Sequence, residues 1–170
     1  MSLLVTGMLF NSLHFLIFFL VVVIIYFLLP FRMRWFFLLA ASYYFYMCWK
    51  AEYAILLVIS TLIDYCAGLK MASAKSASQK KRYLLVSIIS NLGLLFSFKY
   101  FNFFNESLRT LLNSWNIMYN VPAFHALLPV GISFYTFQTM SYSIDVYRGE
   151  QQPERHFGMF ALYVTFFPQL

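Results

Sequence analysis

Long runs of apolar residues with almost no charge constrain the fold of this chain more than any other feature. The first run, Phe15–Leu29 (FLIFFLVVVIIYFLL), is closed by Pro30. With Leu13 and His14 it approaches the ~20 residues that a helix needs to cross the hydrocarbon of a bilayer. A cleaved signal peptide begins with basic residues and ends in small ones, whereas no charged side chain precedes Arg32. We therefore expect a retained membrane span.

Further apolar runs with the length or the aromatic ends of membrane segments are Trp35–Trp49, Tyr53–Leu69, Tyr83–Phe98 and Leu128–Tyr147. The stretch Lys99–Asn120 is more polar. Its apolar residues recur at helical spacing: Phe104, Leu108, Leu111, Leu112 and Trp115. This pattern predicts a helix lying along the membrane surface. The last run, Phe157–Leu170, is too short to span, so we expect it to be re-entrant or truncated.

The composition agrees with a membrane fold, because 62% of the residues are hydrophobic and only 11% are charged. Soluble domains are about 45–50% apolar and about 25% charged. A small soluble fold leaves much of its surface in water, so it could not hide this much apolar surface. We therefore predict an all-α, polytopic transmembrane protein. It should have about five spans, one surface helix and the short final segment, with residues 1–170 forming part of a single membrane-embedded domain.

The basic residues predict the orientation of these spans. The loop Lys70–Arg82 contains five of them and no acidic residue. Alternation of five spans places four more on the same side: Arg32, Arg34, Arg148 and Arg155. Nine of the 12 Lys and Arg residues then share one side, and cytoplasmic loops are the ones enriched in Lys and Arg. We therefore expect the N-terminus outside, and we interpret the +6 net charge as a sign of membrane topology rather than of nucleic-acid binding.

Asp64 is an acidic residue inside an apolar run. A carboxylate at membrane depth is costly, so it should face protein or a water-filled path and could anchor a reactive group. The alternative is that Asp64, six residues before Lys70, lies near enough to the cytoplasmic interface to stay hydrated. Both interpretations remain open at this point.

A polar stripe on the fifth predicted span is the most informative pattern. Its members are spaced by four, three and four residues: Gln138, Tyr142, Asp145 and Gly149. Ser141 and Arg148 border the same face of a helix. Such a stripe lines a cavity or substrate path, or it makes hydrogen bonds between helices; we favour the cavity. Asp145 and Arg148 are also close enough on a helix for an ion pair.

No catalytic or metal-binding set can be assembled from this chain. His14, His125 and His156 are isolated, and Cys48 and Cys66 lie inside apolar runs, where a free cysteine acts as a small hydrophobe. A lone histidine beside a span is more often structural than catalytic. We expect no catalytic residue, no metal and no bound cofactor here.

Two long segments resemble the membrane-bound O-acyltransferase family, and most of all its alginate O-acetyltransferase-like branch. They are LPVGISFYTFQTMSYSIDVYRGE (Leu128–Glu150) and PERHFGMFALYVTFFPQL (Pro153–Leu170). Shorter segments are similar too: MLFNSLHFLIFF (8–19), STLIDYCAGLK (60–70) and FKYFNFFNESL (98–108). The family's catalytic histidine lies downstream of the FFPQL segment, so the resemblance implies an N-terminal fragment. His156 occupies a position where this branch usually has another polar residue.

The resemblance implies an enzyme of the bacterial inner membrane that transfers an acyl group, in this branch acetyl, to hydroxyls of an exported polysaccharide. The donor would be a cytoplasmic thioester, acetyl-CoA or an acyl carrier. The implied partners are membrane lipid, an accessory extracytoplasmic acetyltransferase and polysaccharide-export proteins, and not nucleic acid. One alternative is a transporter or flippase for lipid-linked sugars, with Asp64 and the polar stripe from Gln138 to Asp145 as its polar path. Another is a purely structural subunit.

Overall fold

The computed structural model describes residues 12–48, 51–115 and 131–169, and this part of the chain is helical with no strand. The helices are α1 (Leu13–Leu28), α2 (Phe31–Met47), α3 (Ala51–Ala72), α4 (Ala77–Leu95), α5 (Phe101–Ser114), α6 (Ile132–Arg148) and α7 (Phe157–Thr165). A π-helical turn, η1 (Phe96–Tyr100), joins α4 to α5, and a 3-10 turn, η2 (Phe167–Gln169), follows α7. The predicted all-α membrane class is confirmed.

The helices occur where the apolar runs predict them, with shifted ends. Two segments are long and apolar enough to cross a membrane, Ala54–Ala72 and the continuous Ala77–Ser114, whereas Leu13–Leu28 is apolar but shorter. The count of five spans therefore stays a prediction. Trp49, residues 116–120 and 128–130, and Leu170 belong to predicted elements but lie outside the described residues, as does His125.

Local chemistry sets the helix ends. The Ser12 hydroxyl accepts a hydrogen bond from the Phe15 amide (3.1 Å) at the start of α1, and Ser76 does the same for Gln79 (3.3 Å) at α4. Pro30 separates α1 from α2 because it cannot donate a helical hydrogen bond. Gly149 ends α6 at a φ of 82°, a conformation that glycine adopts without steric cost.

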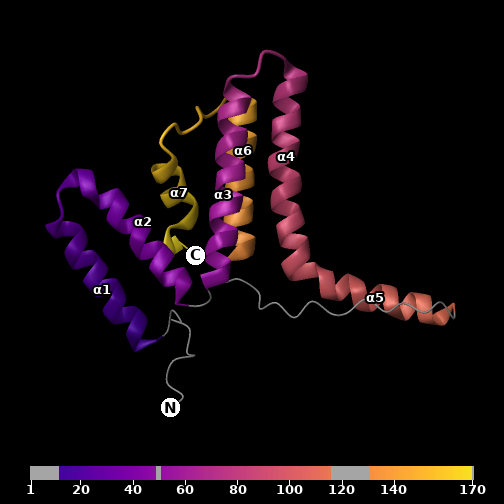
Figure 1. Cartoon of the computed structure of the whole chain (residues 1–170), viewed down its shortest axis with the longest axis horizontal. Helices are drawn as coiled ribbons and strands as arrows, with labels where there is room; N and C mark the ends of the chain where they lie inside the picture. The colour runs from indigo at the N-terminus through magenta and orange to yellow at the C-terminus, as the bar shows by residue number, and fades with distance from the viewer. Residues whose placement is uncertain (1–11, 49–50, 116–130, 170) are drawn as a thin grey trace.

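Helices α3, α4 and α6 stand side by side as one unit (Figure 1) and contact one another along their lengths. The α1–α2 hairpin lies on the other side of α3, and α7 packs between α2 and α3. The first hydrophobic cluster joins α3, α4, α6 and α7 and includes Leu57, Met71, Tyr135, Tyr142 and Phe160. The second lies between α1, α2 and η2 and comprises Val22, Ala41, Phe45 and Phe167.

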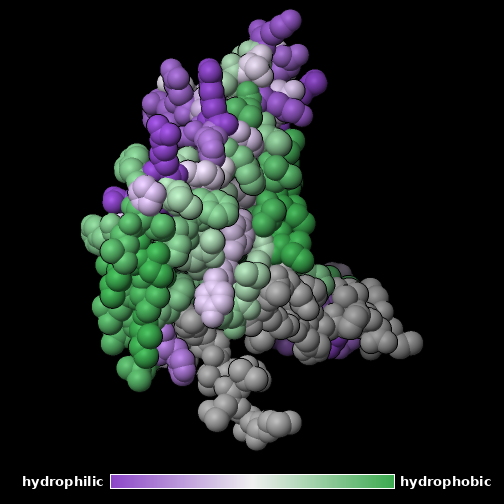
Figure 2. Space-filling view, turned by 60° about the vertical axis from the view of Figure 1, so that its left-hand side comes forward, coloured by the Kyte–Doolittle hydropathy of each residue, from purple (hydrophilic) through white to green (hydrophobic). Residues whose placement is uncertain are grey.

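Three connections that carry basic residues meet at one end of the bundle. The Trp35 and His156 rings are 4.8 Å apart, which brings the start of α2 to the start of α7. The Lys80 ammonium lies 5.6 Å from the Tyr147 ring centroid, which brings α4 to the end of α6. Figure 2 shows hydrophilic residues gathered at this end above a hydrophobic band. The structure therefore places the α1–α2, α3–α4 and α6–α7 connections together; we call this the basic end.

Helix α5 projects away from the bundle at the opposite end (Figure 1). Its apolar side chains are exposed, among them Phe103, Phe104, Leu108, Leu111 and Trp115. Its polar residues, such as Glu106 and Asn113, fall on the other side of the helix. The amphipathic helix predicted for this stretch is confirmed, while its position in the membrane interface remains a prediction.

Candidate functional site

Asp64 lies at the centre of a buried polar network between α3, α4 and α6. Its side chain has no exposed surface. The carboxylate accepts hydrogen bonds from the Ser87 hydroxyl (2.6 Å to Oδ1) and from the Asn91 amide nitrogen (2.8 Å to Oδ1 and 2.9 Å to Oδ2). Ser87 and Asn91 are one turn apart on α4, so both face Asp64. The hydrated position considered for Asp64 is therefore wrong, because helices on two sides exclude water from it.

Helix α6 completes the network with two hydroxyls. The Ser143 and Ser87 hydroxyl oxygens are 2.8 Å apart, and the Thr139 hydroxyl donates to the Asn91 side-chain oxygen at 3.1 Å. All these side chains are buried. One hydrogen-bonded network thus connects Asp64 of α3 through Ser87 and Asn91 of α4 to hydroxyls of α6, so it fixes how the three helices pack against one another.

The negative charge of an ionised Asp64 has no cationic partner among the described residues; its hydrogen-bond donors, Ser87 and Asn91, are uncharged. The buried hydroxyls of Tyr46, Thr61 and Thr136 have no hydrogen-bond partner within the described part of the chain. Buried polar atoms are normally paired. These three hydroxyls, on α2, α3 and α6, are therefore buried polar groups that the described residues leave unsatisfied.

The predicted stripe on α6 packs against α7 and the connection before it. The Gln138 amide nitrogen donates to the Tyr163 carbonyl oxygen at 2.8 Å. The Tyr142 hydroxyl accepts from the Glu154 amide at 3.0 Å, and its ring lies 4.7 Å from that of Phe160. These contacts match the interhelical alternative for Gln138 and Tyr142, and a role in lining a cavity stays a prediction.

The ion pair expected between Asp145 and Arg148 is not formed. Arg148 Nη1 lies 3.9 Å from Glu150 Oε1 instead, and both side chains are largely exposed. The reason is the left-handed turn at Gly149, which reverses the chain and brings Glu150 back beside Arg148. The backbone of Asp145 stabilises this turn, because its carbonyl oxygen accepts hydrogen bonds from the amides of Glu150 (3.0 Å) and Gln151 (3.4 Å).

The connection between α6 and α7 is held rigidly at the basic end. The Tyr65 hydroxyl donates to the Arg155 carbonyl oxygen at 2.5 Å. His156 Nδ1 accepts from the Met159 amide at 3.3 Å and so caps α7. Gly158 lies against the Trp35 ring so closely that a Cβ would be 2.3 Å from Trp35 Cζ3. His156 thus has a structural task here, as helix cap and ring partner.

Three cavities lie away from the predicted site residues. The first, of about 250 Å³, is apolar and lies between α1, α2 and the residues after α7. The second, of about 350 Å³, lies between α3 and α4 beside Cys66 and Lys70. The third, of about 340 Å³, is more polar and is bounded by Ser73, Gln152 and Arg155 at the basic end. Asp64, Gln138, Tyr142, Asp145 and Arg148 line none of them.

Four members of the Asp64 network were not predicted from the sequence: Ser87, Asn91, Thr139 and Ser143. A signal for them exists. Ser87 and Asn91 are four residues apart, as are Thr139 and Ser143. Small polar residues at this spacing in a membrane helix mark a helix–helix interface. A hydroxyl adds little polarity to an apolar run, so the larger polar side chains of Gln138 and Asp145 dominated the predicted stripe. That stripe lies on the neighbouring face of α6.

Comparison with known proteins identifies relatives over nearly the whole chain. No family profile matches it, and no solved structure matches it. The chain is 39% identical to the probable alginate O-acetylase of Azotobacter vinelandii over 96% of its own length. The same identity and coverage hold for the probable alginate O-acetylase of Pseudomonas aeruginosa.

A second kind of relative is the peptidoglycan O-acetyltransferase of Helicobacter pylori, which is 32% identical over 74% of this chain. The chain spans about a third of the length of the two alginate O-acetylases, 33% and 32%, and 27% of the peptidoglycan enzyme. Its similarity covers all three described segments. The chain is therefore homologous to the alginate O-acetylases, and it spans about a third of their length.

Proposed function

We propose that the full-length protein is a membrane O-acetyltransferase that transfers acetyl from a cytoplasmic thioester, acetyl-CoA or an acyl carrier, to hydroxyls of an exported polysaccharide. The observation that carries the proposal is the 39% identity to alginate O-acetylases over 96% of this chain. The relative from Helicobacter pylori is named for a different polymer, peptidoglycan, yet it too is an O-acetyltransferase by name. These relatives favour acyl transfer over the transport of lipid-linked sugars.

The reaction needs a base and a shielded site. The acceptor hydroxyl oxygen attacks the thioester carbonyl, the new C–O bond forms, the C–S bond breaks, and the hydroxyl proton ends on the thiol. A positioned histidine is the usual base for such a proton transfer. In the described part of the chain His156 caps α7 and His14 lies exposed at the start of α1. We therefore expect the base in the remaining two thirds of the protein.

The part of the protein described here would serve as the scaffold of that site. The Asp64 network holds α3, α4 and α6 in one arrangement, and the rigid connection between α6 and α7 lies at the basic end. We propose that this end faces the cytoplasm, because it gathers the predicted cytoplasmic Lys and Arg residues. The N-terminus then lies outside the inner membrane. An accessory extracytoplasmic acetyltransferase and polysaccharide-export proteins are the expected partners.

The test is deletion of the gene in its own host, followed by complementation with the full-length protein. Exported polysaccharide and cell wall are separated, and alkali-labile acetate is measured in each fraction. We expect deletion to remove acetate esters from one fraction and the full-length gene to restore them. Whichever fraction changes identifies the acceptor polymer. An unchanged acetate content in every fraction would refute the proposal.

A further inference from the structure

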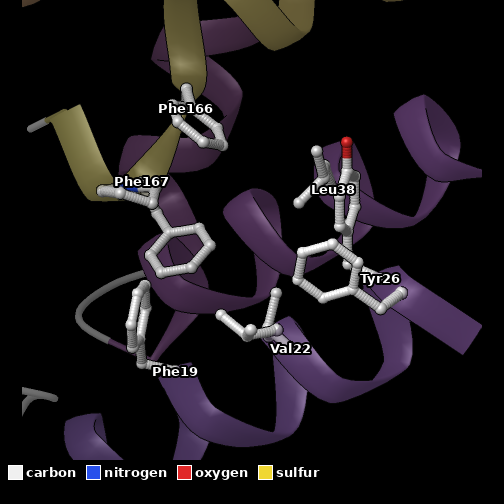
Figure 3. Close-up of a pocket in the computed structure, with 9 residues that line it drawn as sticks. Phe19, Val22, Tyr26, Leu38, Phe166 and Phe167 are labelled. Atoms are coloured by element: carbon white, nitrogen blue, oxygen red, sulfur yellow. The ribbon is translucent and has the colours of Figure 1, made fainter.

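The apolar cavity between α1 and α2 has a volume of about 250 Å³. Figure 3 shows Phe19, Val22 and Tyr26 along α1, opposite Phe166 and Phe167, which come from the residues after α7. The complete lining is Phe19, Val22, Val23, Tyr26, Phe27, Leu38, Phe166, Phe167 and Pro168. All but Tyr26 have no polar side-chain atom. An apolar cavity of about 150 Å³ already binds benzene, so this one has room for a longer hydrocarbon.

The shape of the cavity suits a chain rather than a ring. Its lining extends along α1 from Phe19 to Phe27, a separation of eight residues that corresponds to about 12 Å of helix. One wall is buried, since Val22 is 5% and Phe167 is 1% exposed, whereas Phe27 on the outer side is 70% exposed. The cavity is therefore an elongated trough with a closed floor and an open side.

A half-buried arginine, Arg34, lies beside Tyr26 at the end of the trough that is nearest the basic end. The Arg34 guanidinium carbon lies 4.9 Å from the centroid of the Tyr26 ring, which lines the cavity. Its Nε donates to the Leu29 carbonyl oxygen at 3.0 Å, and this is its only hydrogen bond among the described residues. The two terminal nitrogens therefore keep their donors free. Guanidinium donors in this geometry match the oxygens of a phosphate.

We propose that this trough binds one anionic phospholipid, with an acyl chain along Phe19, Val22 and Tyr26 and the phosphate on Arg34. The position of Arg34 relative to the hydrophobic band is consistent with this assignment. Arg34 belongs to the basic end, where the surface turns hydrophilic (Figure 2), so a phosphate on Arg34 places the attached chain in the hydrophobic band. A second cation, Arg32, is exposed two residues away and adds to the attraction for anionic lipid.

The site is tested on the full-length protein, stripped of lipid in detergent and titrated with dioleoyl phosphatidylglycerol or dioleoylglycerol. The two probes share their acyl chains, but only the first has a phosphate. Native mass spectrometry counts the bound molecules. We expect one phosphatidylglycerol to bind at about a tenth of the dioleoylglycerol concentration, because charge-assisted hydrogen bonds to arginine are strong.

Two variants separate the headgroup contact from the trough. Arg34→Gln should abolish the preference for phosphatidylglycerol, and Val23→Trp, which places a ring in the trough, should displace both probes. The matched controls are Lys75→Gln, which removes a charge at the basic end, and Ile24→Trp, which adds the same ring on an adjacent exposed position outside the lining. Both controls should bind like wild type.

Several results would overturn the proposal. Equal affinity of the wild-type protein for the two probes would show that the phosphate makes no favourable contact. Unchanged binding in Arg34→Gln would do the same. Unchanged binding in Val23→Trp would show that another part of the full-length protein fills the trough. Because the readout is lipid binding, a negative result here leaves the proposed acetyl transfer untouched, and a failure of acetyl transfer leaves the lipid site untouched.

Discussion

The α3–α4–α6 unit and the α1–α2 hairpin are both helical and apolar outside, yet different forces hold them. In the first, Asp64 joins three helices through buried hydrogen bonds with Ser87 and Asn91, and α6 adds Ser143. In the α1–α2 hairpin, packed aromatic rings hold the helices together. The ring centroid of Phe167 in η2 lies 5.2 Å from that of Phe18 and 5.8 Å from that of Phe45.

The difference follows from the solvent. Lipid tails are as apolar as the helices, so burial of apolar surface hardly favours helix association in a bilayer, and close packing or hydrogen bonds must replace it. Hydrogen bonds are directional and define one register of the helices, whereas stacked rings tolerate small shifts. We therefore expect the α3–α4–α6 unit to set geometry and the α1–α2 hairpin to adapt, which suits the proposed lipid trough beside it.

The largest loss of stability is expected for Phe167→Ala in the aromatic region. The ring is 1% exposed and contacts both α1 and α2. Removing such a buried ring costs about 3–5 kcal/mol of unfolding free energy. The measurement is unfolding of the full-length protein in mild detergent. Phe31→Ala, at an 82% exposed site on α2, is the control and should have little effect. An equal effect of both variants would show that Phe167 does not fasten the hairpin.

A smaller loss, about 1–3 kcal/mol, is expected for Asp64→Leu. The leucine removes the carboxylate acceptor of the Asn91 amide nitrogen, which keeps only the Ser87 carbonyl oxygen at 3.0 Å. A buried unsatisfied donor costs about 1–3 kcal/mol. Ser87 keeps the Ser143 hydroxyl at 2.8 Å as a partner, which limits the loss. The same unfolding assay measures it. Wild-type stability in Asp64→Leu would mean that the network does not hold the three helices together.

Gly158→Ala is expected to cost about 1–3 kcal/mol, because the added methyl overpacks the contact between α7 and α2. Its Cβ would be 2.3 Å from Trp35 Cζ3. The smaller ring of Trp35→Phe should restore part of the stability in the double variant. Gly93→Ala, whose Cβ meets nothing within 4 Å, is the control. If the double variant is no more stable than Gly158→Ala alone, the cost has another origin.

The smallest effect is expected for Arg148→Gln. Its ion pair with Glu150 is long at 3.9 Å and exposed, and such pairs contribute about 0–1 kcal/mol. Stability should therefore hardly change, in low salt or high. A loss of several kcal/mol would instead support the ion pair between Asp145 and Arg148 that helical spacing predicts.

The fold was largely predictable because apolar runs and helix breakers are local signals. Pro30, Ser76 and the amphipathic spacing from Phe104 to Trp115 each act within one or two turns. The partners of Asp64 were not predictable in the same way. They lie 23 and 27 residues further along the chain, and which face of α4 meets α3 depends on packing in three dimensions. The predicted Asp145–Arg148 ion pair was wrong because helical spacing takes no account of the turn at Gly149, which brings Glu150 beside Arg148.

The proposed scaffold role of the Asp64 network is tested most directly by acetylation in cells. Asp64→Leu and Asp64→Asn are compared in the full-length protein, with acetate esters normalised to the protein in the membrane. The account predicts that Asp64→Leu loses most of its acetylation per molecule, whereas Asp64→Asn, whose amide oxygen can still accept from Ser87, keeps a substantial part. Normal acetylation per molecule by Asp64→Leu would contradict it.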